Sequence, residues 1–221
     1  SLLNTPWLEV LNPKVALGRV RYALFDFDGT ISVIRHGWEQ IMIPVMVESI
    51  CEDHPVSPEI EAEVAHYVDQ STGILTIKQM KWLEEAVRRY GLAKTQRSAA
   101  EYKRIYNERL LKPVYERLAN IVRPLSDNGG EEQQGSNDHP LQARDAWMIL
   151  GARAFLERLG QRGVRLFLAS GTDQEYVEQE AEALGVTTLF DGQIYGAKGT
   201  SETDSKEMVI QRILDERGLQ G

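Results

Sequence analysis

The sequence predicts an α/β protein with a parallel sheet. Two short, mostly apolar segments, 20–27 and 164–170, have the composition of buried strands, and each leads into a polar turn that contains glycine. A long stretch with mainly helical spacing separates them, and helical and strand patterns alternate after the second one. Strands that alternate with helices are typical of parallel sheets joined by right-handed crossovers.

The composition is that of a packed, soluble protein with one core, or with a core and a smaller second module. The chain has 221 residues, of which 42% are hydrophobic and 26% charged. Its net charge of −8 argues against nonspecific binding to nucleic acids or anionic membranes, which depends on clustered Lys and Arg. No stretch reads as a membrane span or a signal peptide, and the single cysteine, Cys51, cannot form a disulfide within this sequence. We therefore expect a cytoplasmic protein.

The first predicted strand, 20–27, follows an N-terminal arm, 1–19, that we expect to pack on the surface. After the strand, apolar residues at helical spacing predict a helical insert. Ser57 is a suitable N-cap for one of its helices, and Gly91 is a suitable stop for the next. Pro113 is expected to divide the last helix. The predicted helices are 36–51, 58–70, 76–90 and 96–122.

The second half of the chain returns to alternating helices and strands. A polar, low-complexity segment, 126–140, lacks apolar residues to bury and is expected to be a mobile loop. A helix at about 142–159 then leads to the second strand, and Thr172 or Asp173 is expected to cap the helix after it. The remaining predicted elements are a weaker strand or hairpin at 189–195 and a helix at 206–217.

The most informative residues follow the first strand, in the segment Asp26-Phe27-Asp28-Gly29-Thr30. Residues two apart in a strand project to the same side, so Asp26 and Asp28 would crowd two negative charges together. The pair is explained by a hard cation such as Mg²⁺ between the carboxylates, or by one acting as nucleophile and the other as proton carrier. The alternative is an ordinary polar turn that ends the strand at Asp-Gly.

Asp26-x-Asp28-x-Thr30 after a buried strand resembles the first motif of the haloacid dehalogenase (HAD) superfamily. Ser170 at the end of the next core strand resembles the second motif, and Lys206 at the start of a later helix resembles the third. The resemblance implies a Rossmann-like parallel-sheet HAD core with a helical C1 cap domain inserted after the first motif, as in phosphoglycolate-phosphatase-like and β-phosphoglucomutase-like members. The implied division is 20–34 and 145–221 for the core and 35–144 for the cap.

The resemblance also implies a mechanism through an aspartyl-phosphate. Asp26 would attack phosphorus, while Asp28 would protonate the leaving alkoxide and later take a proton from water. Lys206 would offset the negative charge, and Mg²⁺ would be bound by the Asp26 carboxylate and the Asp28 carbonyl. The phosphoryl oxygens would be held by the Ser170 hydroxyl and by nearby groups of Phe27, Gly29, Thr30 and Gly171. Ser170 as a turn cap, and Lys206 as a solvated lysine with Lys198 as its competitor, are the alternatives.

The family's fourth motif, an acidic pair that completes the metal shell, has no counterpart after Lys206. We therefore expect the sequence to be truncated before that motif, or the site to be closed differently. In the family, the strand that carries the motif lies beside the first one. One edge of the strand that ends at Asp26 is accordingly expected to be unpaired or covered by something unusual.

Four residues are expected to contact the substrate: Arg35, His36, Thr72 and Lys78. The function that the resemblance implies is Mg²⁺-dependent hydrolysis of a small phosphorylated metabolite, such as a sugar phosphate or a phosphoglycolate-like acid. A phosphomutase with the same intermediate and a non-catalytic HAD-like binding or regulatory module are the alternatives. No nucleic-acid or membrane partner is expected, and the sequence does not indicate an oligomeric state.

Overall fold

The computed structural model of the chain describes residues 18–122 and 143–198, together with residues 11, 12, 14, 210, 211, 214, 215 and 218. The predicted N-terminal arm, the loop at 126–140 and the helix at 206–217 lie wholly or largely outside the described residues. No helix within the described ranges combines the length and the apolar character that crossing a membrane requires.

A parallel three-stranded sheet forms the centre of the fold, which confirms the predicted α/β class. The strand order is β1 (Tyr22–Phe25), β2 (Arg165–Asp173) and β3 (Ile194–Ala197). Phe25 lies opposite Leu168 in the ladder between β1 and β2, and both ladders are parallel. Among the described residues β1 therefore has a strand neighbour on one edge only, as expected.

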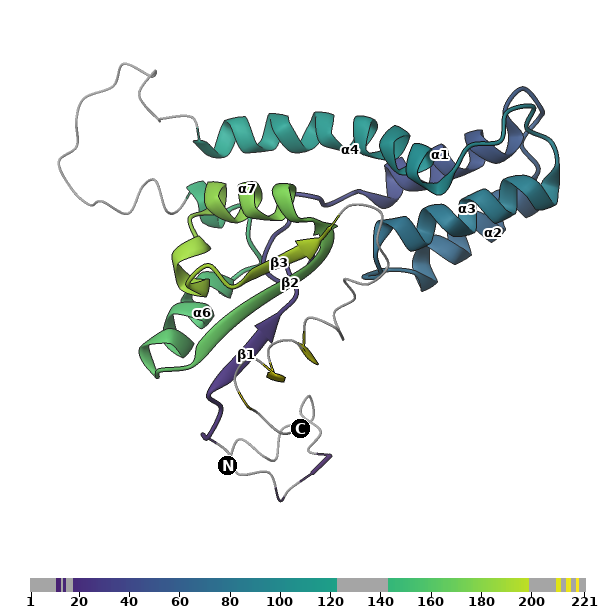
Figure 1. The fold of residues 1–221 in the computed structure, drawn as a ribbon. Coiled ribbons are helices and arrows are strands. Elements are labelled where there is room, and N and C mark those ends of the chain that lie inside the picture. Colours follow the sequence, from purple (N-terminus) through teal and green to yellow (C-terminus); the bar gives the residue numbers. More distant parts are fainter. Residues whose placement is uncertain are drawn as a thin grey trace, which may run out of the picture.

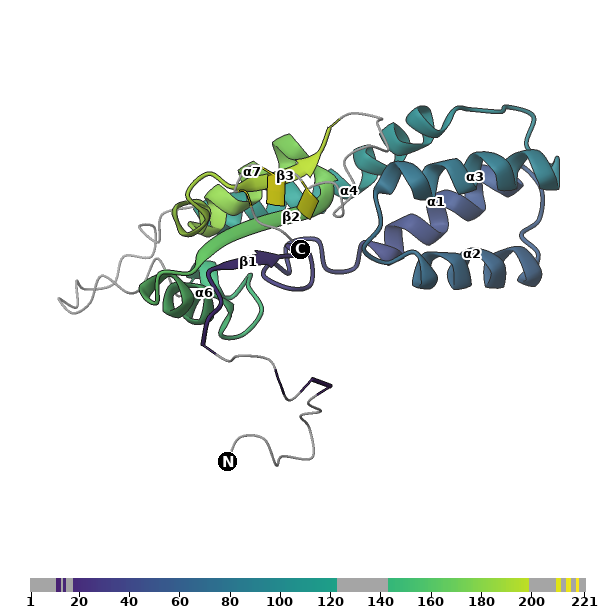
Figure 2. The same cartoon turned by 60° about the horizontal axis from the view of Figure 1, so that its bottom comes forward.

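Four helices lie beyond the carboxyl ends of β1 and β2, and together they form the helical insert (Figures 1 and 2). They are α1 (Glu39–Cys51), α2 (Pro58–Gln70), α3 (Thr76–Tyr90) and α4 (Ala99–Val122). Helix α1 contacts the other three, and α4 also reaches back to α7 (Gln174–Leu184) beside the sheet (Figure 1). The interior of the insert is apolar, because Met46, Leu83 and Tyr102 are fully buried between the helices.

Two of the predicted helix boundaries are confirmed by their geometry. The Ser57 side chain accepts a hydrogen bond of 3.3 Å from the backbone N–H of Ile60, as an N-cap does. Gly91 ends α3 in the left-handed conformation, with φ of 62°. Pro113 does not divide α4, because Leu110 and Val114 on either side of it are buried and stabilise one continuous helix.

The predicted helix at 142–159 is interrupted, because residues 143–145 are helical but a turn at 146–151 separates them from α6 (Ala152–Gln161). Met148 in this turn forms an antiparallel bridge with Ser32. The N–H of Val33 donates to Trp147 at 3.0 Å, and the N–H of Ile149 donates to Ile31 at 2.9 Å. These long-range bonds satisfy backbone groups that a helix would otherwise use, and they support the loop that follows Asp28.

The remaining elements also differ in detail from the prediction. Asp173 precedes α7, but neither its side chain nor that of Thr172 caps the helix. The Asp173 carboxylate instead accepts hydrogen bonds from Lys103 and Asn107 of α4, which join the insert to the core. The segment predicted as a strand or hairpin forms a 3₁₀ turn, η2 (Thr187–Phe190), and then β3, which pairs in parallel with β2 and is therefore not a hairpin.

Candidate active site

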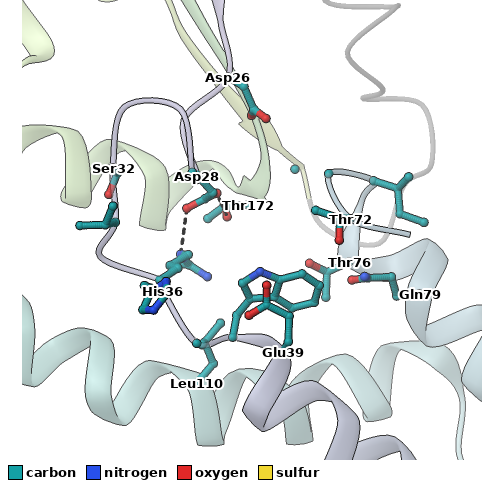
Figure 3. A pocket seen from close by; sticks show the side chains of 18 of the residues that line it. Asp26, Asp28, Ser32, His36, Glu39, Thr72, Thr76, Gln79, Leu110 and Thr172 are labelled. Carbon is teal, nitrogen blue, oxygen red and sulfur yellow. Dashed lines mark hydrogen bonds and ion pairs between the residues drawn. The ribbon is translucent and has the colours of Figure 1, made fainter. Parts of the chain in front are cut away.

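The loop after β1 places Asp26 and Asp28 at the edge of the sheet that faces the helical insert (Figure 3). Between them the Phe27 side chain is completely buried and anchors the loop in the core. The Phe27 carbonyl accepts hydrogen bonds from the N–H groups of Ile31 and Ser32 at 2.9 and 3.0 Å, which turns the chain sharply. Gly29 within this turn has a φ of 73°, a left-handed conformation that glycine adopts without steric cost.

Asp26 and Asp28 both line a cavity of about 280 Å³ between the sheet and the helical insert. This volume is close to the lower end of the roughly 300–1,000 Å³ typical of small-molecule sites. The opposite wall comes from all four helices of the insert or from the turns that join them. The residues there include Trp38, Glu39, Thr72, Thr76, Gln79, Tyr106 and Leu110.

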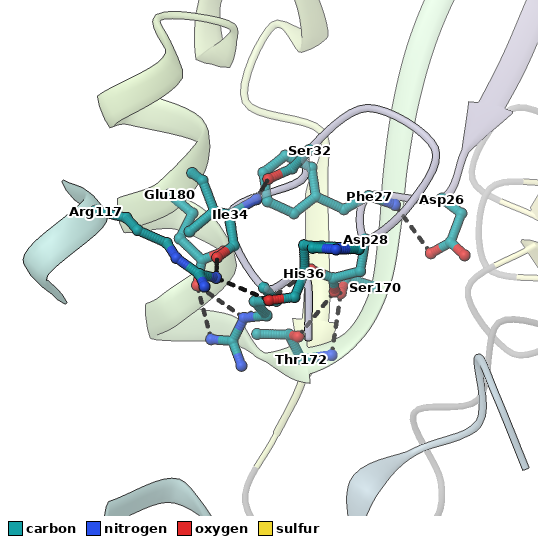
Figure 4. Close-up of polar contacts among 11 residues, drawn as sticks. Asp26, Phe27, Asp28, Ser32, Ile34, His36, Arg117, Ser170, Thr172 and Glu180 are labelled. Carbon is teal, nitrogen blue, oxygen red and sulfur yellow. Dashed lines mark hydrogen bonds and ion pairs between the residues drawn. The ribbon is translucent and has the colours of Figure 1, made fainter. Parts of the chain in front are cut away.

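Two hydroxyl groups from β2 hold one oxygen of Asp28 (Figure 4). Ser170 Oγ donates to Asp28 Oδ2 at 3.1 Å, and Thr172 Oγ1 donates to the same oxygen at 3.0 Å. The backbone N–H of Thr172 donates to Ser170 Oγ at 3.0 Å, which orients that hydroxyl. The other Asp28 oxygen, Oδ1, is buried and has no hydrogen-bond partner among the described residues. The site thus fixes Asp28 through one oxygen and leaves the second one free of hydrogen bonds.

A buried ion pair lies directly behind Asp28. Arg35 Nε and Nη2 donate to Glu180 Oε1 of α7 at 2.9 and 2.7 Å, and Arg35 Nε is 3.9 Å from Asp28 Oδ1. Burial raises the pKa of Glu180, although the Arg35 charge opposes that effect. Burial would lower the pKa of Arg35, but the neighbouring Glu180 and Asp28 carboxylates outweigh it and hold that pKa above its usual value. Arg35 therefore stays charged.

Residues of α4 complete this side of the cavity. The Arg117 guanidinium donates to the backbone carbonyls of Ile34 and His36, on either side of Arg35 (Figure 4). Tyr106 lines the cavity and is buried, and this burial raises the pKa of its hydroxyl far above the ordinary value. The segment that carries Arg35 is therefore held from two directions, by α4 and by α7.

The structure brings together most of the residues that the sequence singles out. Asp26, Asp28, Gly29, Arg35, His36, Thr72 and Gly171 line the cavity. Ser170 is nearly inaccessible and reaches the site through its bond to Asp28. Lys206 lies outside the described residues, so its position beside Asp26 stays a prediction.

Two predicted substrate contacts are not brought to the cavity. Lys78 is exposed on α3, because Thr76 and Gln79, three positions apart, take the helix face toward the cavity. Thr30 is exposed on the loop and does not line the cavity. The expected phosphate donors in this loop are also engaged within it. The N–H of Phe27 donates to Asp26 Oδ1, that of Thr30 to the Phe27 carbonyl and that of Gly29 to the Ser32 carbonyl.

A family model for haloacid dehalogenase-like hydrolases matches residues 20–218 of the chain. The chain belongs to this family. The match spans the three strands, the helical insert and the acidic loop, and it confirms the resemblance drawn from the motifs at the level of the family.

This HAD-like hydrolase is also similar in structure to a solved protein, the crystal structure of a predicted phosphatase from Clostridium acetobutylicum. The TM-score is 0.52 at 16% sequence identity, over 91% of this chain and 72% of the other. At this identity the likeness shows a shared fold. A search of curated proteins gives no significant match.

Several functional candidates of this HAD-like hydrolase escaped the sequence analysis. Thr172 follows Ser170 by two positions in β2, so strand alternation was a signal that both hydroxyls share one face. Glu180 and Tyr106 carry no comparable signal, because each reaches the site by the packing of a helix over the end of the sheet.

Gly171 of β2 lies against the turn at 71–75 of the insert. A Cβ added there would be 3.0 Å from the Ile74 carbonyl oxygen. We expect Gly171→Ala to displace the turn at 71–75 and to lower kcat/KM by about ten- to a hundredfold, because small misplacements of positioning groups are costly. Steady-state kinetics of phosphate release will measure this loss in kcat/KM. Gly160→Ala is the matched control, since nothing lies within 4 Å of its added Cβ. Equal activities of the two variants would refute the close contact.

Proposed function

We propose that this HAD-like hydrolase is a Mg²⁺-dependent phosphatase that hydrolyses a small phosphorylated metabolite through an aspartyl-phosphate. The observation that carries the proposal is the convergence of Asp26 and Asp28 on one cavity, with Asp28 fixed through a single oxygen by Ser170 and Thr172. One carboxylate is thereby available as a nucleophile and the other as a positioned acid and base, which is the pair of groups that the reaction needs.

In the first step, an Asp26 oxygen attacks phosphorus, and the bond from phosphorus to the leaving oxygen breaks as the new bond forms. Asp28 gives its proton to the leaving oxygen, so that a neutral alcohol departs. In the second step Asp28 takes a proton from water, and the water oxygen attacks the phosphorus of the aspartyl-phosphate. Inorganic phosphate leaves and the Asp26 carboxylate is restored. The reaction depends chiefly on positioning and on stabilisation of the transferring charge.

The residues present suit a magnesium ion. Mg²⁺ prefers oxygen ligands and is commonly bound by one or two carboxylates, with waters and substrate phosphate oxygens completing the octahedron. The Asp26 carboxylate and the Asp28 backbone carbonyl, both in the loop after β1, would bind the Mg²⁺ ion. No cluster of three or more His, Cys, Asp or Glu side chains capable of holding a metal occurs in the described ranges, so further ligands would have to be waters, substrate oxygens or residues outside those ranges. Bound there, Mg²⁺ would offset the charge of the phosphoryl group. Lys206 is proposed to add to this effect.

The helical insert, 35–144, is proposed to act as a C1 cap over a core made of 20–34 and 145–221. Its residues His36 and Thr72 line the cavity opposite Asp26, where the alcohol part of a substrate would lie. Opening and closing of such a cap would admit substrate and exclude water. This protein is proposed to be similar to the phosphoglycolate-phosphatase-like and β-phosphoglucomutase-like members of the family. Sugar phosphates and phosphoglycolate-like acids are therefore the substrate classes to assay first.

The direct test is phosphate release by the full-length protein from p-nitrophenyl phosphate and from a panel of phosphorylated metabolites. We expect turnover with Mg²⁺ and a loss of at least about tenfold after chelation with EDTA, reversed when Mg²⁺ is added back. Transfer of the phosphoryl group to a second sugar position, with little free phosphate, would indicate a phosphomutase instead. No turnover on any substrate would favour a non-catalytic binding module and refute the proposal.

A further inference from the structure

Two polar side chains on the insert side of the cavity have no partner among the described residues. Glu39, in the first turn of α1, lies across the cavity from Asp26 and Asp28, and its carboxylate makes no hydrogen bond or ion pair within the described part of the chain (Figure 3). Tyr106 of α4 lines the same cavity, is 4% exposed, and its hydroxyl also makes no hydrogen bond to a described residue. Buried polar groups are normally hydrogen-bonded, so a ligand in the cavity is a suitable partner for both.

The charges that line the cavity are mostly negative. Among the described residues they are the carboxylates of Asp26, Asp28 and Glu39 and the guanidinium of Arg35. The Arg35 charge is already compensated, because its Nη2 atom lies 2.7 Å from Glu180 Oε1 and its Nε atom lies 3.9 Å from Asp28 Oδ1. Arg35 is therefore not a spare positive charge for a second anionic group of a substrate.

Glu39 alone gives the insert side of the cavity a carboxylate. The two aspartates on the opposite side are assigned to the phosphoryl group, and the alcohol part of a substrate would lie toward the insert. The other polar residues on that side include His36, Thr72 and Thr76, so no lysine or arginine of the insert helices α1 to α4 lines the cavity within the described ranges. A hydroxyl or ammonium group of the substrate could donate to Glu39, whereas a carboxylate would face a like charge.

We propose that Glu39 is a specificity-determining residue, which selects phosphate esters whose alcohol part ends in a hydroxyl or an ammonium group and disfavours those that end in a carboxylate. This inference rests on the phosphatase function proposed above and narrows its substrate class. Of the two classes named there, it favours sugar phosphates over phosphoglycolate-like acids. The property that Glu39 recognises is a hydrogen-bond donor, which both a hydroxyl and an ammonium group supply.

The test compares three linear phosphate esters that differ only at the far end of a three-carbon alcohol. They are propanediol phosphate, aminopropanol phosphate and phosphorylated hydroxypropanoate, which end in a hydroxyl, an ammonium and a carboxylate group. We expect kcat/KM of the natural protein for each of the first two to exceed that for the third by at least about fivefold, as one charge at about 4 Å in a solvent-accessible site would produce. Ionic strength is held constant, because salt screens this effect.

Glu39→Gln tests whether the carboxylate sets the preference. Glutamine keeps the size of the side chain and an acceptor oxygen but removes the charge. We expect kcat/KM to rise by about five- to tenfold for the carboxylate ester, to fall by a similar factor for the ammonium ester, and to fall by no more than about threefold for the hydroxyl ester. Loss of folded protein would lower all three values together, so opposite changes can come only from the charge.

Glu61→Gln is the matched control. Glu61 is also an exposed glutamate in the first turn of an insert helix, α2, but it does not line the cavity. This variant should leave all three values of kcat/KM within about twofold of those of the natural protein. Calorimetric binding of the three esters to Asp26→Asn, which is expected not to turn them over, gives the same order of preference without the reaction.

The outcomes separate this role from the phosphatase function. Equal or better turnover of the carboxylate ester by the natural protein, or changes in the same direction for all three esters in Glu39→Gln, would overturn the role of Glu39 and leave the phosphatase function intact. A preference for only one of the two donor-bearing esters, lost in Glu39→Gln, would support the role and identify the group. No turnover of any ester would refute the phosphatase function, and the binding order on Asp26→Asn would then decide the selectivity by itself.

Discussion

Asp26→Asn is expected to lower kcat by at least about a thousandfold, because an amide cannot act as the attacking carboxylate and no covalent intermediate can form. The change preserves the shape of the side chain, and its oxygen can still accept the hydrogen bond from the N–H of Phe27. Stopped assays of phosphate release, run with alkyl and aryl phosphates, will measure the loss. We expect the same loss on both, because both need the nucleophile.

Asp191→Asn is the matched control for this substitution. Asp191 lies in a turn before Gly192 and is exposed, and its positive φ of 49° is tolerated by asparagine. It should retain the activity of the natural protein. Substantial turnover by a folded Asp26→Asn protein would contradict the assignment of the nucleophile, whatever the behaviour of the control.

Asp28→Asn is expected to give the second largest effect, and a selective one. The amide oxygen can still accept from Ser170 and Thr172, so the side chain keeps its place but carries no proton to transfer. For an alkyl phosphate kcat should fall by about a hundred- to ten-thousandfold, the usual contribution of general acid–base catalysis. For an aryl phosphate the first step is largely spared, and the second step becomes limiting because no base activates the water.

The role assigned to Asp28 also predicts that the covalent intermediate accumulates when Asp28 is replaced. With an aryl phosphate, Asp28→Asn should release a rapid burst of phenolate that is followed by slow turnover, as phosphorylated Asp26 accumulates. The natural protein should show a smaller burst. Equal losses on alkyl and aryl phosphates without any burst would show that Asp28 has another role.

The position of the site could be predicted because it depends on topology. The carboxyl ends of neighbouring parallel strands meet at one edge of a sheet, so Asp26 after β1 and Ser170 in β2 had to lie close together once both strands were recognised. The helices with strong end signals, such as the Ser57 cap and the Gly91 stop, were predictable for a similar reason, since these signals are local.

What the sequence did not predict depends on the contacts between elements. The turn at 146–151 replaces part of a helix because Met148 pairs with Ser32, and no local pattern encodes that pairing. The packing of the insert sets how α3 is rotated about its axis. As a result Thr76 and Gln79 line the cavity, and Lys78 does not. Glu180 is one of several glutamates on α7, and its ion pair with Arg35 is apparent only from the burial that the two side chains share.

Trapping of the covalent intermediate tests the central claim most directly. The protein, mixed with Mg²⁺ and an excess of substrate, is quenched in acid within the first turnovers and digested, and the peptides are analysed by mass spectrometry. The account predicts a phosphoryl group on the Asp26 side chain that is absent from Asp26→Asn and accumulates in Asp28→Asn. Phosphate release at full rate with no phosphorylated Asp26 peptide in any of the three proteins would contradict it.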